Sequence, residues 1–297
     1  MSVQVDTALV QSYHSNINIK FQQMGSRLRP YVRVETQNAE FDFYDRITAT
    51  TAVEVTTRHG DTPLISTPHD RRRVGLRDFD WADLIDRKDR LRMLADPTSP
   101  YTTNAVYALG RSMDDIIIEA AFGTAYTGKT GSTSVTFASA SEVAVSYVES
   151  GVAANSNLTI GKLRRVRYLL DKAEATIDGA FDLIAVVDPS QIQSLLRTTE
   201  VTDADYNTVK ALVEGNVDTF MGFKFVKSNR LPVASSVRSC LFFERQGLLL
   251  AVASEVMTDI GPRRDKRNSV QVYACGSFGS ARMWEEKVLR VKCDETV

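Results

Sequence analysis

The sequence predicts an α+β fold organised around one long helix. Residues 99–123 carry apolar side chains at steps of three and four, which places them on one face of a helix. At 1.5 Å per residue, such a helix is about 35 Å long. Strand-like segments rich in Val, Phe and Tyr precede it, and apolar strands mixed with shorter helices follow it. This order of elements is typical of an α/β or α+β unit.

Local signals predict where the long helix begins and ends. Ser99 and Pro100 have the residue types of an N-cap and a first-turn proline. Gly123 is a natural C-terminal stop, because glycine readily takes the left-handed conformation that ends many helices. We therefore expect the helix to cover residues 100–123.

The first 29 residues form a polar arm with a thin apolar stripe. Val5, Leu9, Tyr13 and Ile17 are spaced by four, which indicates weak helical amphipathicity. The stripe suits a short surface helix. It also suits an arm that docks on a neighbouring subunit, because it is too thin for a core helix.

Residues 46–80 predict a long β-hairpin. One β-rich arm covers residues 47–57, the other runs from Ile65 to Phe79, and turn-forming residues 58–63 lie between them. Neither arm has enough large apolar residues for a core, and a two-stranded hairpin alone is marginally stable in water. The hairpin therefore needs a partner surface, on this chain or on another copy.

One arm of the predicted hairpin carries three consecutive arginines, Arg71, Arg72 and Arg73. Such a cluster can be a solvated edge that prevents aggregation. It can equally be a patch of salt bridges between subunits. The next stretch, residues 81–94, alternates acidic and basic side chains at helical spacing, which predicts a second amphipathic helix.

After the long helix, the pattern predicts a compact α and β region. The expected helices cover residues 159–175 and 191–197, the second capped by Asp188 with Pro189 in its first turn. The expected strands cover residues 181–187, 217–226, 239–243, 248–253, 269–278 and 281–292, and residues 259–267 form an exposed basic loop.

Composition excludes several classes of function. The 297 residues have a formal net charge of −1, which argues against nucleic-acid binding by broad counterion release. No apolar run approaches the roughly 18 residues of a membrane span. Three cysteines and three histidines are scattered along the chain, so a disulfide framework, a His or Cys metal site and a Ser–His triad are all disfavoured.

Candidate enzyme motifs are weak. Residues 123–130 match the spacing of a phosphate-binding loop, but a helix precedes them where a buried strand is needed, and β-branched residues follow. Asp114, Asp115 and Glu119 could act in acid–base chemistry, yet solvated or subunit-contact roles are favoured. His59 and His69 lack a standard metal-ligand spacing. We therefore predict no catalytic, cofactor-binding or metal-binding residue.

Eight stretches carry a resemblance to a known family: RHGDT at 58–62, HDRRRV at 69–74, DWADLID at 80–86, DP at 96–97, NAVYALGR at 104–111, DDIIIEAAFGTAYTG at 114–128, VDTFMGFKFVKSNRLP at 217–232 and GSFGSARMWEEKVLRVKCDE at 276–295. In their order and spacing they resemble the major capsid proteins of tailed bacteriophages, which have the Hong Kong-97-type fold.

The resemblance implies four parts: an N-terminal arm (1–40), an extended β-hairpin loop (41–80), a peripheral domain (81–129 and 251–297) with a spine helix at 100–123, and an axial domain (130–250). It implies a non-enzymatic protein that self-assembles into an icosahedral shell around double-stranded DNA, through arm and hairpin contacts between subunits. Candidate intersubunit residues are Arg58, Asp61, Arg71, Arg72 and Arg73.

The resemblance also implies partners and a location. The chain pairs with itself in hexamers and pentamers, with a portal and a separate scaffolding protein during assembly, and weakly and nonspecifically with packaged DNA. It is part of the virion, assembled in the bacterial host cytoplasm, with no membrane partner. Some family members cross-link through a lysine in the extended loop; residues 46–80 contain no lysine, so no such cross-link is expected by that route. The alternative is an encapsulin-like nanocompartment shell.

Overall fold

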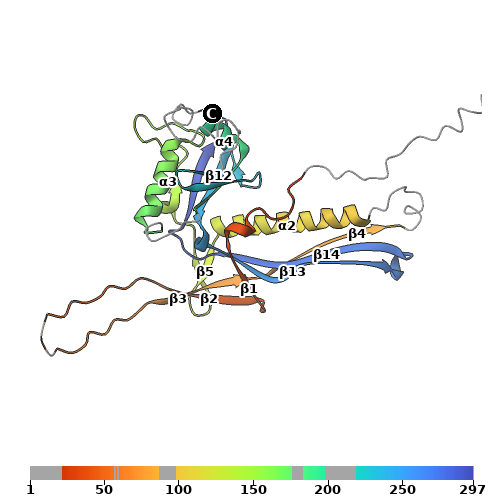
Figure 1. Cartoon of the computed structure of the whole chain (residues 1–297), viewed down its shortest axis with the longest axis horizontal. Coiled ribbons are helices and arrows are strands. Elements are labelled where there is room, and N and C mark those ends of the chain that lie inside the picture. The colour runs from red at the N-terminus through yellow and green to blue at the C-terminus, as the bar shows by residue number, and fades with distance from the viewer. Residues whose placement is uncertain are drawn as a thin grey trace, which may run out of the picture. The chain divides into compact units, whose positions relative to one another are not determined.

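The computed structural model describes residues 22–56, 58, 60–86, 98–175, 183–197 and 219–296 (Figure 1). It divides into two compact units. The first contains Met1–Ser26, Asp78–Ser112 and Ser254–Ser277, and the second contains Arg27–Arg77, Met113–Ala253 and Phe278–Val297. The expected mixed α and β architecture is confirmed.

The helices are α2 (Thr98–Phe122), α3 (Ile160–Lys172) and α4 (Pro189–Leu196). The strands are β1 (Arg33–Thr36), β2 (Phe41–Ile47), β3 (His69–Gly75), β4 (Arg77–Ile85), β5 (Ala125–Thr127), β6 (Thr133–Val135), β7 (Glu142–Val143), β8 (Leu183–Val187), β9 (Thr219–Phe220), β10 (Phe223–Lys227), β11 (Val233–Ala234), β12 (Val237–Glu244), β13 (Leu248–Arg263), β14 (Ser269–Arg282) and β15 (Val288–Asp294).

These strands form three sheets among the described residues. Their orders are β1-β13-β14-β4, β7-β15-β12-β8-β10-β9 with β11 added beside β12, and β2-β3-β5-β6. Strand β8 has the sequence LIAVV and is buried along its whole length, as expected for a strand inside a sheet. Its neighbours are β10, which runs parallel to it, and β12, which runs antiparallel.

In the first unit, the N-terminal part of α2 packs on strand residues. Ala105 and Leu109 contact Ala274 of β14, and partly buried Phe79 and Trp81 of β4 pack against them. The main chain at Gly25 passes so close to α2 that a Cβ on Gly110 would lie 2.5 Å from it. Glycine is therefore required at this point of the helix.

In the second unit, helix caps follow the local sequence signals. The side chain of Thr159 accepts a hydrogen bond from the backbone N–H of Lys162 at the start of α3. Asp188 and Gln191 form a capping box at the start of α4, with Pro189 in the first turn. The predicted ends of α2 and α4 are thus confirmed within one or two residues.

Two of the three cysteines are buried in the large sheet. Cys240 of β12 and Cys293 of β15 are fully buried, with their sulfur atoms 3.9 Å apart, and both are free thiols. Cys275 on β14 is partly exposed. In the described part of the chain, no helix is long and apolar enough to cross a membrane.

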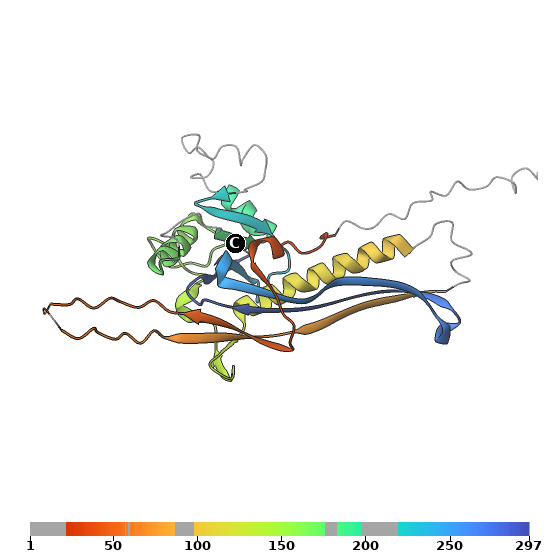
Figure 2. The ribbon, with the colours of Figure 1, turned by 60° about the horizontal axis from the view of Figure 1, so that its bottom comes forward.

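Four predicted elements need correction. The strand expected at 281–292 is divided, because residues 281–282 end β14 and residues 283–287 lie in no strand before β15. Residues 48–56 form no strand, so the hairpin arms are the shorter β2 and β3 (Figure 2). Residues 81–85 belong to β4, because the two-residue alternation of Phe79 and Trp81 against α2 overrides the helical charge pattern. Residues 259–263 lie in β13 rather than in a loop. The predicted arm before residue 22 and the remainder of the predicted helix at 87–94 lie outside the described residues.

Candidate assembly site at the base of the extended loop

The chain between β2 and β3, residues 48–68, is called here the β2–β3 loop. It runs out from the end of β2 and returns to β3 without pairing as strands (Figures 1 and 2). Every side chain described in it is exposed, including four apolar ones: Val53 at 55%, Val55 at 60%, Leu64 at 97% and Ile65 at 47%. Apolar side chains gathered on one exposed segment mark a surface that another molecule covers.

The β2–β3 loop rises from a small sheet with two different faces. Strand β2 pairs with β3, which pairs with β5, which pairs with β6. Since successive side chains in a strand point to opposite faces, Arg71 and Arg73 share one face while Arg72 and Val74 share the other. We call the face of Arg72 the inner face and the face of Arg71 and Arg73 the outer face.

The inner face packs on the core of the second unit. Val74 is buried against Leu249, Ala251, Ala281 and Met283, with Tyr44 and Trp284 at the margin. This packing joins the base of the loop to β13 and to the end of β14.

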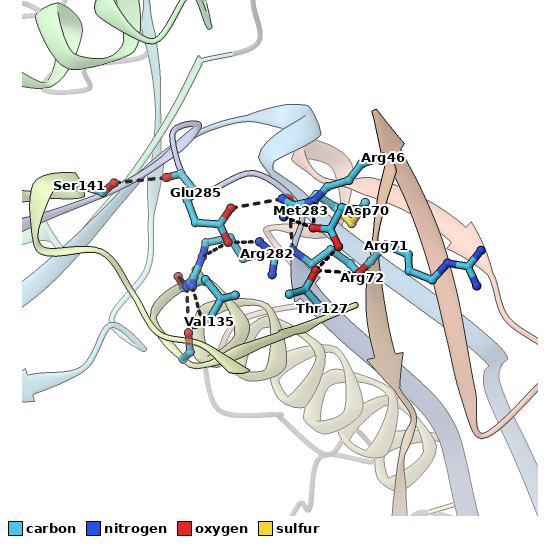
Figure 3. Close-up of polar contacts among 12 residues, drawn as sticks. Arg46, Asp70, Arg71, Arg72, Thr127, Val135, Ser141, Arg282, Met283 and Glu285 are labelled. Carbon is cyan, nitrogen blue, oxygen red and sulfur yellow. Dashed lines mark hydrogen bonds and ion pairs between the residues drawn. The ribbon is translucent and has the colours of Figure 1, made fainter. Parts of the chain in front are cut away.

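Beside this core lies a partly buried group of charged and polar residues, called here the Glu285 cluster: Arg46, Asp70, Arg72, Thr127, Arg282 and Glu285 (Figure 3). The Arg72 side chain is completely buried and donates to Glu285, while its Nε lies 3.5 Å from the carbonyl oxygen of Met283. Arg46 donates to the same carbonyl at 2.7 Å and to Glu285 at 3.3 Å. One carboxylate therefore holds arginines from both β2 and β3.

Asp70 forms a second anionic centre of the cluster. It accepts from Arg46 Nη2 at 2.6 Å and from the hydroxyl of Thr127 on β5 at 2.5 Å. Burial by itself raises the pKa of Asp70, but the hydrogen bonds from Thr127 and Arg46 outweigh it, so its pKa lies well below the usual range. Asp70 is thus held ionised and links β3 to β2 and β5.

Arg282 connects the Glu285 cluster to the end of α2. Its side chain is completely buried, and its guanidinium donates to the carbonyl oxygens of Ala121 at 2.8 Å, Gly123 at 2.9 Å and Val135 at 3.3 Å. The last carbonyls of a helix have no partner within the helix, and a cation there is also favoured by the helix dipole. Arg282 therefore caps α2 from another element.

The cluster carries one more positive charge than negative. Three arginines, Arg46, Arg72 and Arg282, face two carboxylates, Asp70 and Glu285. Burial lowers the pKa of both Arg72 and Arg282, with Glu285 acting in the opposite direction. A buried charge is costly unless a partner neutralises it, so Glu285 is the residue on which the cluster depends.

The outer face carries arginines alternating with aromatic rings. The guanidinium of Arg73 lies 4.9 Å from the ring centre of Phe41 and 4.8 Å from that of Tyr126, on neighbouring strands. Arg71 lies 5.9 Å from the ring of Phe43 and pairs with Asp45 at 3.0 Å. Arg and aromatic residues are the types enriched where proteins contact each other.

The predicted intersubunit residues fall in three places. Arg58 and Asp61 lie on the exposed β2–β3 loop, and Arg71 and Arg73 lie on the outer face. Arg72 is a correction: it lies inside the subunit, because strand alternation turns it away from its two neighbours and towards Glu285. Because side chains alternate along a strand, the sequence alone indicates that three consecutive arginines cannot all lie on the same face.

The other candidate motifs have structural roles. Residues 125–135 form the β5–β6 hairpin, in which Gly128 and Gly131 take positive φ, and no helix follows Lys129. Asp114 is buried and accepts from the backbone N–H groups of Arg27 at 3.0 Å and Leu28 at 3.1 Å, so it is neither a solvated nor a subunit-contact residue.

Among the described residues, the remaining acidic and histidine candidates do not form a common site. Asp115 pairs with Arg230, Glu119 pairs with Arg77, His69 is exposed, and His59 lies outside the described residues. In the described part of the chain, no group of three or more His, Cys, Asp and Glu side chains is arranged to hold a metal ion.

A family model described as phage capsid protein matches residues 5–295. None of the curated protein sequences matches the chain.

Solved structures with a similar fold include phage capsids. The capsid of the cyanophage P-SCSP1u has a TM-score of 0.75 at 13% identity, covering 97% of this chain and 94% of that one. The capsid of Helicobacter pylori bacteriophage KHP30 has a TM-score of 0.74 at 8% identity over 99% and 98%. Mycobacterium phage Che8 has 0.68 at 14% identity over 97% and 98%.

The family model, together with the fold, defines the class of protein as a phage capsid protein. The chain belongs to the phage capsid protein family, and its fold is the Hong Kong-97-type fold.

Proposed function

We propose that the chain is the major capsid protein of a tailed bacteriophage and builds an icosahedral shell around double-stranded DNA. The observation that most strongly supports this proposal is the exposure of apolar side chains on the β2–β3 loop. Its exposed Val53, Val55, Leu64 and Ile65 have no cover within the described chain. A second copy would bury them, and a protein that tiles a closed shell has such copies on every side.

The proposal extends to the residues that make contacts between copies. Arg58 and Asp61 lie on the loop, and Arg71 and Arg73 lie on the outer face beside its base. The four parts expected from the sequence, 1–40, 41–80, 81–129 with 251–297, and 130–250, are retained as proposed assembly regions.

Partners and location follow from the same proposal. Copies meet in hexamers and pentamers, and a separate scaffolding protein and a portal take part in assembly. The net charge of −1 suits a wall that encloses DNA without binding it tightly. The protein acts in the virion after assembly in the bacterial host cytoplasm, and its role is structural, not enzymatic. The comparisons lend no support to the encapsulin-like alternative.

The test is assembly of the purified chain, expressed alone and with the scaffolding protein of its phage, followed by negative-stain electron microscopy. The wild type is expected to form closed shells. The double variant V55D/L64D is expected to form few, because two charges would have to be buried at each loop contact. Its subunit stability should not change, since both side chains are exposed.

Thr62→Asp is the matched control, because Thr62 is a polar, exposed residue of the same loop. It should assemble like the wild type. A wild-type chain that stays monomeric under every condition, with scaffold included, would contradict the proposed function. If V55D/L64D assembles normally, the proposed shell function stands, but the β2–β3 loop does not make the contacts between copies.

A further inference from the structure

Two strand faces carry opposite charges: Arg71 and Arg73 lie on the outer face, and Asp78 and Asp80 lie on β4. Among the described residues, Arg71 has only an exposed ion pair with Asp45, and no ion pair holds Arg73, Asp78 or Asp80. We propose that Arg71 and Arg73 of the outer face bind Asp78 and Asp80 on β4 of a second copy of this chain. This inference rests on the proposed function, because it names the partner surface within the shell.

Arg73 is held ready to bind a carboxylate. The rings of Phe41 and Tyr126 lie 4.9 Å and 4.8 Å from its guanidinium. The β5–β6 turn passes so close that a Cβ on Gly131 would lie 2.6 Å from Arg73 Cδ. A guanidinium held between rings keeps its N–H edge free for a bidentate contact, and little side-chain entropy is lost when that contact forms.

The surroundings of Arg73 have room for an acidic side chain. Among the described residues, no carboxylate pairs with Arg73. A hollow of about 260 Å³ lies beside it, with Phe41, Tyr126 and Arg77 also on its wall. Arg71 is paired with Asp45, but both side chains are exposed, and such a surface pair contributes little and can exchange partners.

The acidic surface lies on an edge strand. Phe79 and Trp81 of β4 pack towards α2, so Asp78 and Asp80 point to the opposite face and are exposed. They accept hydrogen bonds from Ser277 at 2.5 Å and Tyr273 at 2.7 Å, which are neutral donors. No cation pairs with either aspartate in the described part of the chain. An edge strand of a sheet is also open to a neighbouring molecule.

The two charged faces match in spacing. Residues two apart on a strand face are separated by about 6.6 Å, so Arg71 and Arg73 present two positive charges at the same interval as the negative charges of Asp78 and Asp80. A contact that joins two different patches of neighbouring copies is heterologous, and heterologous contacts form a ring when the rotation between copies closes, as it does in a capsid hexamer or pentamer.

The experiment is a two-for-two charge exchange in the full chain, under conditions in which the wild type assembles. Three variants are needed: R71E/R73E, D78R/D80R and the quadruple variant with all four changes. Each reversed pair places like charges together, which opposes contact. We expect each double variant to lower the yield of shells at least tenfold, and the quadruple variant to recover most of it.

Thermal unfolding of the unassembled subunits checks that each variant is folded. If a reversed variant unfolds, the neutral pairs R71Q/R73Q and D78N/D80N take its place. Each neutral pair is expected to reduce the yield several-fold. Wild-type yield from either folded pair would overturn the inference, and the charges would then be solvated edges. A quadruple variant that folds but does not recover would also overturn it.

Mixing the two double-reversed variants adds a test of the heterologous geometry. In a six-membered ring, each R71E/R73E copy can alternate with a D78R/D80R copy, with favourable charges at every contact. We expect six-membered rings from the mixture where each variant alone gives few. Absence of rings from the mixture would overturn the inference. A wild type that fails to assemble would instead contradict the proposed function.

Discussion

The two faces of the small β2-β3-β5-β6 sheet differ sharply, although consecutive residues build them. On the inner face, Arg72 is buried and shares Glu285 with Arg46 and Arg282. On the outer face, Arg71 and Arg73 lie against aromatic rings at a surface. The difference teaches that residues of one run of arginines can differ in role: the inner arginine anchors the loop base, and the outer ones lie at the surface, where we propose that they bind a second copy.

The largest expected effect comes from removing the shared anion on the inner face. Glu285→Gln keeps the shape of the side chain but leaves three buried arginines with Asp70 alone. We expect a loss of about 3 kcal/mol or more in the free energy of unfolding, because an uncompensated buried charge is strongly destabilising. Urea unfolding of the unassembled subunit measures it.

The neighbouring Glu286→Gln is the control for this change, because Glu286 is exposed. It should alter the free energy of unfolding by less than about 0.5 kcal/mol. Equal effects of the two variants would contradict the importance given to Glu285.

A smaller effect is expected at Asp70, and it depends on pH. Its pKa is lower in the folded state than in the unfolded chain, so its ionised form stabilises the fold above the unfolded value of about 3.9. That contribution declines as the pH falls below this value towards the folded pKa. Asp70→Asn should therefore cost about 1–2 kcal/mol at pH 7.

The difference between Asp70→Asn and the wild type should shrink when unfolding is measured below about pH 4. Asp45→Asn, at an exposed carboxylate of β2, should show little change at either pH. A difference that grows with acidity would show that Asp70 is not held ionised by Thr127 and Arg46.

The smallest effects are expected on the outer face. Arg73→Ala removes two cation–π contacts and should lower subunit stability by about 1 kcal/mol. Arg71→Ala removes one distant ring contact and an exposed ion pair, and should cost less than about 0.5 kcal/mol. Thermal unfolding of both variants measures which of them loses more stability. An Arg71 effect as large as that of Glu285→Gln would remove the distinction between the two faces.

Much of the fold is readable from the sequence because its signals are local. The ends of α2, the capping box at Asp188 and the apolar run of β8 each depend on a few adjacent residues. The Glu285 cluster is different. Arg46 and Glu285 lie 239 positions apart in the chain, and no local pattern joins them.

Two errors of the sequence interpretation share a physical cause. Residues 48–56 are rich in Thr and Val, but strand propensity expresses packing against neighbours, and the side chains of these residues are all exposed. At residues 81–85 two periodicities compete, and packing of Trp81 on the α2 side decides for the strand. In both places the outcome depends on a surface that is distant in sequence.

The buried thiols of the large sheet give a practical means to follow these experiments. Of the three cysteines, Cys240 and Cys293 are closed off between β12 and β15, while Cys275 is partly open. A thiol-reactive dye should therefore label one position per folded chain and three per unfolded chain. Labelling of Cys240 and Cys293 therefore reports opening of the large sheet, and none of the variants proposed above changes a cysteine.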